Sequence, residues 1–232
     1  MTPRVRKIEA VFLDMDNTLF DFVSAKLEAC RGMVEYLGKG SPEELFSYFR
    51  RGIYDFEHPL NISDYLHEKG IFSDHDFEKC VSIYEKIKLD NIELYPNVKE
   101  TLCGINRQGL KVVIVTDAHT NGTLYRLEKT ELLEMVDEII TCDMTEAKKP
   151  SEKVFRFALE KCDLLAHSCI YVGDSIRRDI EPAKNVGMVT AYAAYGDRNN
   201  QKVQIDSADY VLEDIKELMP ILENLQKNNS GK

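Results

Sequence analysis

The sequence predicts an α/β protein, with a doubly wound core on a parallel five-stranded sheet and an inserted all-helical domain. Two observations lead to this prediction. Short, mainly apolar runs alternate with amphipathic segments, and one long stretch near the N-terminus has helical spacing without a strand. Continuous apolar runs are typical of strands that are buried on both faces of a parallel sheet. The runs are Ala10–Leu13, Lys111–Val115, Glu138–Thr141, Cys169–Val172 and Val189–Ala193.

The helices of the core are expected between these strands. Amphipathic segments cover Val98–Gln108, Thr123–Glu134, Ser151–Cys162 and Ile176–Asn185. Gly109 and Gly187 follow two of them, where a helix commonly ends in a glycine. Near the C-terminus, Asp209–Val211 predicts a short edge strand and Ile215–Gln226 a closing helix. In such a fold, ligands bind at the carboxyl ends of the strands.

Residues 21–94 interrupt the alternation of strand and helix. This stretch has no convincing strand, and its helical spacing covers Phe22–Leu37, Pro42–Phe56, Ile62–Lys69 and Asp74–Leu89. We therefore expect residues 1–20 and 95–232 to form the α/β core. Residues 21–94 are expected to form a helical cap domain, inserted between the first two strands.

The composition narrows the partners and the compartment. The 232 residues are 44% hydrophobic and 30% charged, as in a folded globular protein. A net charge of −10 argues against nucleic-acid polymers and anionic membranes, because both require basic patches. No apolar stretch is long enough to span a membrane, and no signal peptide is evident. The six cysteines show no CxxC or zinc spacing, so we expect them to be reduced in a cytoplasmic monomer or homodimer.

Two short acidic motifs carry the strongest chemical signal. Asp14 and Asp16 directly follow the first apolar run, and Asp174 and Asp179 follow the fourth. Four carboxylates brought to one place repel one another and raise each other's pKa values unless a cation lies among them. Mg²⁺ is the simplest such cation, because it prefers a few carboxylates together with water and a phosphate oxygen.

The first motif has the residue types that phosphoryl transfer requires. Asp14 can act as a nucleophile toward phosphorus and form an acyl phosphate. Asp16 can protonate the leaving oxygen and then deprotonate the attacking water. Two aspartates at this spacing would more often be a solvated turn. A motif that continues to Thr18 directly after a strand is much more specific.

Two further positions can hold a phosphoryl group, although each signal is weak alone. Thr116 ends the second strand, where its hydroxyl and the following backbone N–H groups can bind a phosphoryl oxygen. Lys149 precedes Pro150 and can place an ammonium between an anionic nucleophile and an anionic ester. A threonine at a strand end is usually only a cap, and a lysine before a proline is common.

The second acidic motif suits metal binding. Asp174 lies in a Gly-Asp turn after a strand, and Asp179 lies about one turn further into a helix. Asp174 and Ser175 could instead simply cap the helix that begins near Ile176.

In order, these motifs resemble those of the haloacid dehalogenase superfamily, in the branch with a helical cap that includes phosphoglycolate phosphatases. They are DMDNT from Asp14, Thr116, Lys149 before Pro150, and GDSIRRD from Gly173 to Asp179. The resemblance covers nearly the whole chain and implies a Rossmann-like core. It also implies that Asp14 is the nucleophile and Asp16 the general acid and base.

The resemblance further implies which residues bind metal and phosphate. Mg²⁺ would be held by Asp14, the main-chain carbonyl of Asp16, and Asp174, with Asp179 supporting the site. Thr116 and Lys149 would bind the transferred phosphoryl group. One departure is Asp117-Ala118, where relatives often carry Asn-Gly or Asn-Ser. Asp117 is therefore an extra acid near the phosphate, and it is expected among the substrate-binding residues with Thr116 and Lys149.

The reaction implied is Mg²⁺-dependent hydrolysis of a small phosphomonoester, of the phosphoglycolate, glyceraldehyde phosphate or nucleoside monophosphate type. Dehalogenases of the superfamily use no metal and lack an aspartate at the position of Asp16, so a 2-haloacid dehalogenase is disfavoured. A sugar phosphomutase differs only in the hydroxyl that receives the phosphoryl group and stays an alternative. A catalytically silent binding protein would be expected to lose the nucleophile, and Asp14 is present.

Substrate specificity is expected to come from the cap. Arg50 is the candidate substrate-binding residue there, although an arginine on such a helix is as often part of a solvated face. Other candidates near hinges or helix ends are Phe22, Arg51, Tyr54, His58 and His119.

Overall fold

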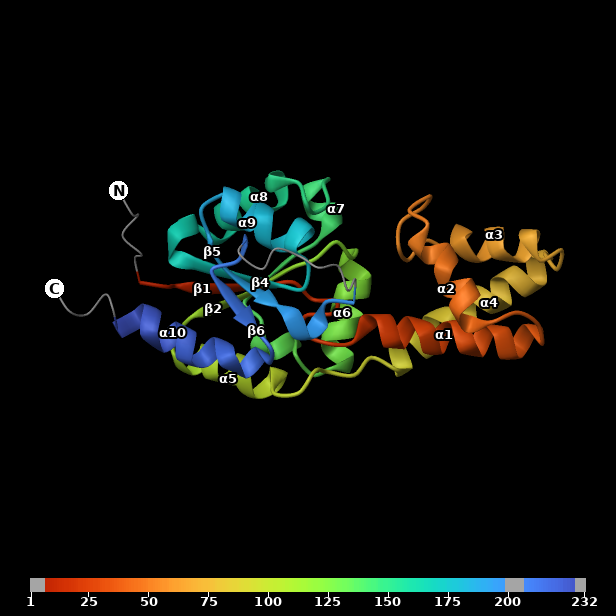
Figure 1. The fold of residues 1–232 in the computed structure, drawn as a ribbon, viewed down its shortest axis with the longest axis horizontal. Helices are drawn as coiled ribbons and strands as arrows, with labels where there is room; N and C mark the ends of the chain where they lie inside the picture. Colours follow the sequence, from red (N-terminus) through yellow and green to blue (C-terminus); the bar gives the residue numbers. More distant parts are fainter. Residues whose placement is uncertain (1–6, 199–206, 228–232) are drawn as a thin grey trace. The chain divides into compact units, whose positions relative to one another are not determined.

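A computed structural model describes residues 7–198 and 207–227 of the chain. These residues divide into two compact units, with boundaries between Asp21 and Phe22 and between Glu93 and Leu94. The α/β unit contains the chain before Phe22 and after Glu93, and the helical unit contains Phe22–Glu93. Figure 1 shows the sheet of the first unit and helices α1–α4 of the second.

The α/β unit is built on one parallel sheet. Its strand order is β3-β2-β1-β4-β5-β6, and each neighbouring pair is parallel. The strands are β1 Ala10–Leu13, β2 Lys111–Val115, β3 Glu138–Ile140, β4 Cys169–Gly173, β5 Val189–Ala193 and β6 Tyr210–Leu212. The chain builds outward from β1 to one edge and then returns through β4 to the other, which confirms the doubly wound fold.

The predicted count of five strands is one too low. The segment expected as a separate short edge strand forms β6 and pairs in parallel with β5, with Ala193 opposite Leu212. Only three residues pair, and only Leu212 among them is fully buried. The sequence predicts this segment as a short edge strand apart from the five, and its parallel pairing with β5 places it in the same sheet.

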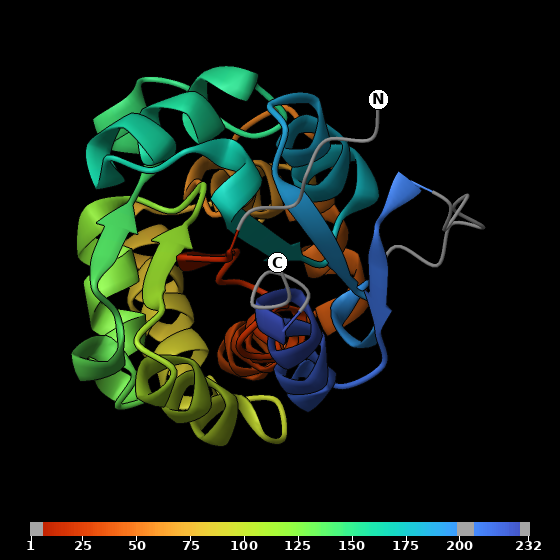
Figure 2. The same cartoon turned by 90° about the vertical axis from the view of Figure 1, so that its left-hand side faces the viewer.

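Helices cover both faces of the sheet. Figures 1 and 2 show α8 and α9 on one face and α5 and α10 on the other. The bounds are α5 Val98–Arg107, α8 Glu152–Cys162, α9 Glu181–Asn185 and α10 Leu218–Lys227. On the first face, Phe12 and Tyr171 of the sheet pack with Phe155 of α8 in the main hydrophobic core. The sheet is thus buried on both sides, and its polar groups are placed at strand ends.

Short elements connect these layers. They are α6 Thr120–Lys129, α7 Cys142–Thr145, the 3₁₀ turns Leu133–Met135, Ala166–Ser168, Ala194–Gly196 and Ile215–Glu217, and a π-helical turn (η3) at Ile176–Ile180. The helix expected at Thr123–Glu134 begins three residues earlier, because the Asp143 carboxylate accepts a hydrogen bond from the Thr120 N–H. It ends at Lys129, and Glu131 just beyond has a positive φ of 58°.

The helical unit contains α1 Phe22–Leu37, α2 Pro42–Arg50, α3 Leu60–Glu68 and α4 Asp74–Asp90. Serine caps start two of these helices: Ser41 Oγ accepts from the Glu44 N–H at 3.1 Å, and Ser73 Oγ accepts from the Asp76 N–H at 3.0 Å. The helix predicted for Pro42–Phe56 stops at Arg50, where Gly52 follows with a φ of 69°.

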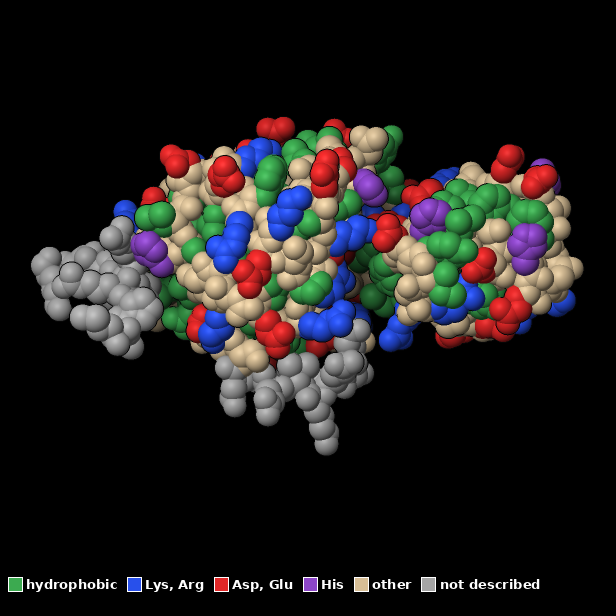
Figure 3. Space-filling model, turned by 90° about the horizontal axis from the view of Figure 1, so that it is seen from above, with side chains coloured by type: hydrophobic (Ala, Val, Ile, Leu, Met, Phe, Trp, Pro, Cys, Tyr) green, Lys and Arg blue, Asp and Glu red, His purple; other side chains and the backbone are tan. Residues whose placement is uncertain are grey.

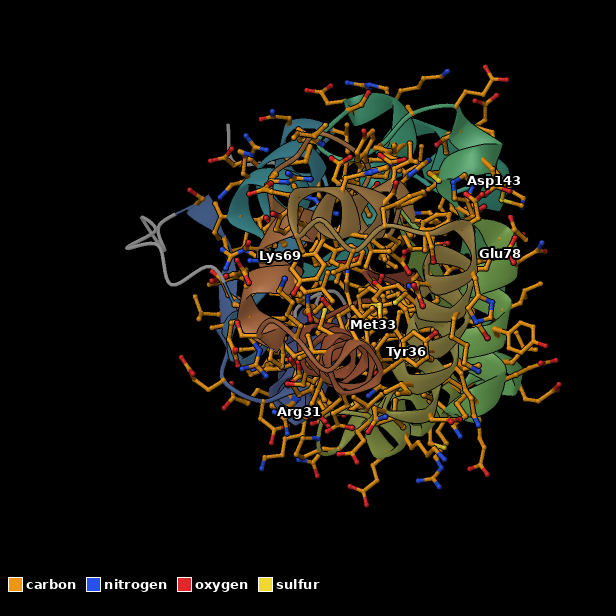
Figure 4. All side chains as sticks on the ribbon, turned by 90° about the vertical axis from the view of Figure 1, so that its right-hand side faces the viewer. Arg31, Met33, Tyr36, Lys69, Glu78 and Asp143 are labelled. Carbon is orange, nitrogen blue, oxygen red and sulfur yellow. The ribbon has the colours of Figure 1, made fainter. Side chains whose placement is uncertain are left out.

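The four helices enclose a hydrophobic core of their own. It includes Met33 of α1, Phe49 of α2, Tyr65 of α3 and Tyr84 of α4. The Phe49 and Tyr84 rings stack with centroids 4.9 Å apart. Figure 4 shows Met33 among the helices and Arg31 on the outer side of α1.

The surface of both units is mixed in charge. Figure 3 shows acidic and basic side chains interspersed on the face that it presents. In the described ranges, no helix combines the length and apolarity that crossing a membrane requires.

Candidate active site

The carboxyl ends of three adjacent strands meet at one point of the sheet edge. Asp14 follows β1, Thr116 follows β2 and Asp174 follows β4 within one residue of the strand end. The register holds these ends level, since Leu13 pairs with both Ile114 and Val172. The Asp14 N–H also donates to the Val172 carbonyl at 2.8 Å. The parallel sheet therefore gathers residues that are far apart in sequence.

Three carboxylates form a compact cluster at this edge. Ligand oxygens of Asp14, Asp174 and Asp179 lie within 4.8 Å of one another, and all three residues are buried. The π-helical turn brings in Asp179, whose N–H donates to the Ser175 carbonyl at 2.8 Å. Glycine is required at position 173, because a Cβ there would lie 2.5 Å from the Cβ of Asp179.

The electrostatics of this cluster call for a cation. Burial raises the pKa of Asp14 to about 7, against the opposing charge of Lys149. Burial, followed by the charges of Asp14 and Asp179, raises the pKa of Asp174 well above its usual value. Without a cation, these carboxylates do not all ionise at neutral pH, because burial and mutual repulsion oppose it. A hard divalent ion bound among them would favour their ionised forms. The cluster fits Mg²⁺, which takes a few carboxylates and completes its shell with water and substrate oxygens.

Lys149 supplies one positive charge from within the protein. Its Nζ lies 2.5 Å from Asp14 Oδ1 and 2.6 Å from Asp179 Oδ1. It also donates to the Tyr171 hydroxyl at 3.3 Å, and that hydroxyl donates to Asp179 Oδ1 at 3.1 Å. Burial acts to lower the pKa of Lys149, but the charges of Asp14 and Asp179 outweigh it and hold that pKa well above its usual value. The ammonium is therefore charged and directed at the carboxylate that ends β1.

A tight loop positions Asp16. The Asn17 N–H donates to the Phe20 carbonyl at 2.9 Å, and Asn17 has a positive φ of 60°. Gly196 presses against this loop, since a Cβ there would lie 1.7 Å from the Asn17 backbone oxygen. The Asp16 carboxylate accepts two hydrogen bonds from Arg126 Nη1, at 2.9 and 2.8 Å. Arg126 lies on α6 and is only 4% exposed, so the pair is a fixed part of the site.

With this geometry in place, the comparisons with known proteins decide the family. Residues 11–193 match the haloacid dehalogenase-like hydrolases. The chain belongs to this family.

Several known proteins are similar to this hydrolase over nearly its whole length. It is 26% identical over 230 residues to glyceraldehyde 3-phosphate phosphatase of Methanocaldococcus jannaschii, covering 95% of this chain and 100% of that protein. It is 26% identical over 229 residues to phosphoglycolate phosphatase of Nitrosospira multiformis, covering 93% and 96% respectively. The solved structure of a HAD phosphatase from Thermococcus onnurineus matches with a TM-score of 0.67 and 26% identity, covering 93% and 98%.

Asp117 of this hydrolase contacts two basic residues of the site, Lys149 and Arg178. Its Oδ1 accepts from the Lys149 backbone N–H at 2.9 Å, and its Oδ2 pairs with Arg178 Nη2 at 2.7 Å. Both carboxylate oxygens are thus engaged by the protein. The structure offers no contact that tests the expected role of Asp117 in binding substrate, and that role stays a prediction.

Thr116 is almost fully buried beside it. Its Oγ1 accepts from the Ala118 N–H at 3.1 Å, and its own N–H donates to the Ile140 carbonyl at 2.9 Å. These bonds leave the hydroxyl hydrogen available as a donor, in line with the predicted contact to a phosphoryl oxygen.

Arg50 belongs to the helical unit, where it ends α2 and is exposed. Its neighbour Arg51 instead pairs with Asp64 at 2.7 Å. The expectation that Arg50 binds substrate stays untested.

Several residues that shape the site carried no signal in the sequence. Arg126 binds the carboxylate of Asp16, and Tyr171 binds that of Asp179. Tyr171 reads as one more apolar residue of a buried strand, and Arg126 reads as a polar position on a helix. Only the fold brings them into contact.

Proposed function

We propose that this hydrolase is a Mg²⁺-dependent phosphatase, which cleaves a small phosphomonoester through an aspartyl-phosphate intermediate on Asp14. The observation that carries the proposal is the buried cluster of Asp14, Asp174 and Asp179 around the Lys149 ammonium. The names of its similar proteins, glyceraldehyde 3-phosphate phosphatase and phosphoglycolate phosphatase, support the same reaction class.

Asp14 would attack the phosphorus of the ester. One of its oxygens forms a bond to phosphorus while the bond from phosphorus to the ester oxygen breaks. The carboxylate must be ionised to attack, and the Lys149 ammonium 2.5 Å away favours that state. The same ammonium, with the Thr116 hydroxyl, would bind the non-bridging oxygens of the phosphoryl group.

Asp16 would move the protons. A protonated Asp16 gives its proton to the departing ester oxygen, and the resulting carboxylate then takes a proton from water. That water attacks phosphorus and releases inorganic phosphate from Asp14. The contact of Arg126 Nη1 with both carboxylate oxygens fixes the direction of the carboxylate but favours its ionised form. We therefore expect this contact to loosen when substrate binds and Asp16 takes up its first proton.

Asp14, Asp174 and the main-chain carbonyl of Asp16 would hold Mg²⁺, with Asp179 supporting them. When bound, the ion neutralises the carboxylates and the phosphoryl oxygens and so lets two anions approach.

The substrate class follows from the same comparisons. Two of the similar proteins named above act on phosphorylated compounds of few carbon atoms, so we propose phosphoglycolate or glyceraldehyde phosphate ahead of a nucleoside monophosphate. Residues 21–94 would serve as the cap that encloses the ester, with Arg50 as a candidate contact. All six cysteines are free thiols, which supports a cytoplasmic setting.

The test is phosphate release from a panel of small phosphomonoesters, with Mg²⁺ and with a chelator, for the wild type and Asp14→Asn. The proposal predicts release that requires Mg²⁺ and is abolished in the variant, because the substitution removes the nucleophile and almost no volume. Full activity of Asp14→Asn would reject Asp14 as nucleophile. Transfer of the phosphoryl group to a second sugar hydroxyl, without phosphate release, would identify a mutase instead.

A further inference from the structure

A second group of metal-ligating side chains lies outside the carboxylate cluster. His119 precedes α6, and Cys142 and Asp143 begin α7. One ligand atom from each of the three residues lies within 4.8 Å of the other two. Figure 4 shows Asp143 at the surface of the α/β unit. The three residues come from the connections that follow the neighbouring strands β2 and β3.

The donor atoms distinguish this group from the carboxylate cluster. A thiolate and an imidazole are soft or borderline ligands, which favour Zn²⁺ and similar ions over Mg²⁺. The three carboxylates of the active site have the opposite preference. The two groups of side chains therefore favour different cations.

Hydrogen bonds already fix one ligand of this group. The Asp143 carboxylate accepts from the Thr120 N–H at 3.0 Å and from the Thr120 hydroxyl at 2.7 Å. Hydrogen bonds from Thr120 therefore hold both oxygens of the carboxylate in a fixed direction. Hydrogen-bonded carboxylates of this kind are typical of oriented metal ligands.

The other two ligands can complete the site with small movements. The Cys142 N–H donates to the Ala118 carbonyl at 3.3 Å, which joins the two connections. His119 Nδ1 lies 3.9 Å from Asp143 Oδ1, and its side chain is 73% exposed, so the ring can turn toward an ion. His119 and Asp143 are both exposed, so solvent reaches the group.

We propose that His119, Cys142 and Asp143 form a binding site for a Zn²⁺-type divalent ion, with a fourth position open to solvent. Binding replaces the Cys142 S–H bond with a sulfur–metal bond and releases that proton to water. His119 is three residues after Thr116, so the ion would also stiffen the connection that begins with the proposed phosphate-binding threonine.

Cobalt provides a direct probe, because Co²⁺ occupies zinc sites and its bond to a thiolate produces a charge-transfer band in the near ultraviolet. We expect the reduced protein to develop this band as Co²⁺ is added and to lose it when Zn²⁺ displaces Co²⁺. Cys142→Ser should abolish the band. Cys103→Ser removes a partly exposed cysteine on α5 and is the matched control, so its band should be unchanged.

Two further variants separate this site from the active site and from misfolding. Asp174→Asn disrupts the carboxylate cluster but should keep the band. His119→Asn changes an exposed side chain and should weaken Zn²⁺ affinity about tenfold or more without a change in circular dichroism. Absence of the band in wild type, its persistence in Cys142→Ser, or unchanged affinity in His119→Asn would overturn the proposal.

Discussion

Lys149 of the α/β unit and Lys26 of the helical unit each place a positive charge inside the protein, in different ways. Lys149 is 4% exposed and Lys26 is fully buried. The Nζ of Lys149 lies within 2.6 Å of two carboxylate oxygens, from Asp14 and Asp179. The Nζ of Lys26 lies 4.4 Å from the centre of the Phe49 ring and 3.2 Å from that of Phe56, and it donates to the Phe56 carbonyl.

The different surroundings of the two ammonium groups indicate a structural role for Lys26 and a functional role for Lys149. Ring faces and a carbonyl stabilise an ammonium through cation–π attraction and a hydrogen bond, which suits the packing of a small helical unit. The carboxylates around Lys149 outnumber it, since Asp14, Asp174 and Asp179 share one cluster. Buried carboxylates that outnumber the neighbouring cations, and whose pKa values are raised, are typical of a catalytic site. The comparison therefore predicts that the two lysines respond differently to substitution.

The largest effect is expected for Lys149→Met. We expect kcat/KM for phosphate release to fall about 10³-fold, the scale of losing one electrostatic donor to a transition state. Lys26→Met is the matched control, because it removes an equally buried ammonium from the other unit. A loss below about tenfold in Lys149→Met, or equal losses in the two variants, would contradict the different roles assigned to the two lysines.

The next effect is a dependence of stability on pH in the absence of Mg²⁺. The pKa of Asp14 is raised to about 7 in the folded protein, whereas the unfolded carboxyl ionises near 3.8. Between these values the folded state binds more protons, so the free energy of unfolding should fall as pH rises from about 4 to about 7. A shift from 3.8 to about 7 corresponds to a loss on the order of 4 kcal/mol.

Urea unfolding in a chelator at about pH 5 and about pH 7.5 measures this slope. Asp14→Asn should reduce it, and Mg²⁺ should flatten it, because the cation favours the ionised carboxylates. Stability that rises over this range in wild type would contradict the assigned shift.

A smaller effect is expected for Arg126, which orients Asp16. We expect Arg126→Met to lower kcat about 30-fold for an alkyl phosphate, whose leaving oxygen needs a proton. The loss should shrink for an aryl phosphate such as p-nitrophenyl phosphate, which leaves without one. Arg126→Lys keeps the charge but loses the planar guanidinium, so its loss of kcat should be smaller than that of Arg126→Met. Equal losses of kcat for both kinds of ester would show that Arg126 has no part in proton transfer.

The smallest effect is expected for Lys26→Met on stability. Removal of the cation–π contacts costs about 2 kcal/mol at most, and relief of a buried charge offsets part of that cost. We expect the urea midpoint to change slightly and phosphate release to stay within about twofold of wild type. A collapse of the helical unit, seen by circular dichroism, would show that Lys26 is essential for its fold.

The sequence was most informative where a candidate functional residue directly follows a buried strand. The strands β1, β2 and β4 are apolar runs, and Asp14, Thr116 and Asp174 follow them directly. Parallel pairing then brings these positions together almost by necessity. The doubly wound fold and the carboxylate cluster were predictable for this reason.

Contacts between distant elements were not predictable in this way. Arg126 meets Asp16 across 110 positions, and Arg178 meets Asp117 across 61. Arg126 belongs to no local pattern, and the motif that contains Arg178 does not indicate that Asp117 is its partner. The second cation site was hidden for the same reason, since His119 and Cys142 lie in separate connections and no zinc spacing joins them.

The most direct test of the account is a search for the phosphoryl group on Asp14. Wild-type protein is mixed with substrate and Mg²⁺, stopped in acid within one turnover, and digested for mass spectrometry. We predict that one phosphoryl group appears on the peptide that contains Asp14, and that none appears in Asp14→Asn. Turnover with an unmodified Asp14 peptide, or with the phosphoryl group on another residue, would contradict the central claim.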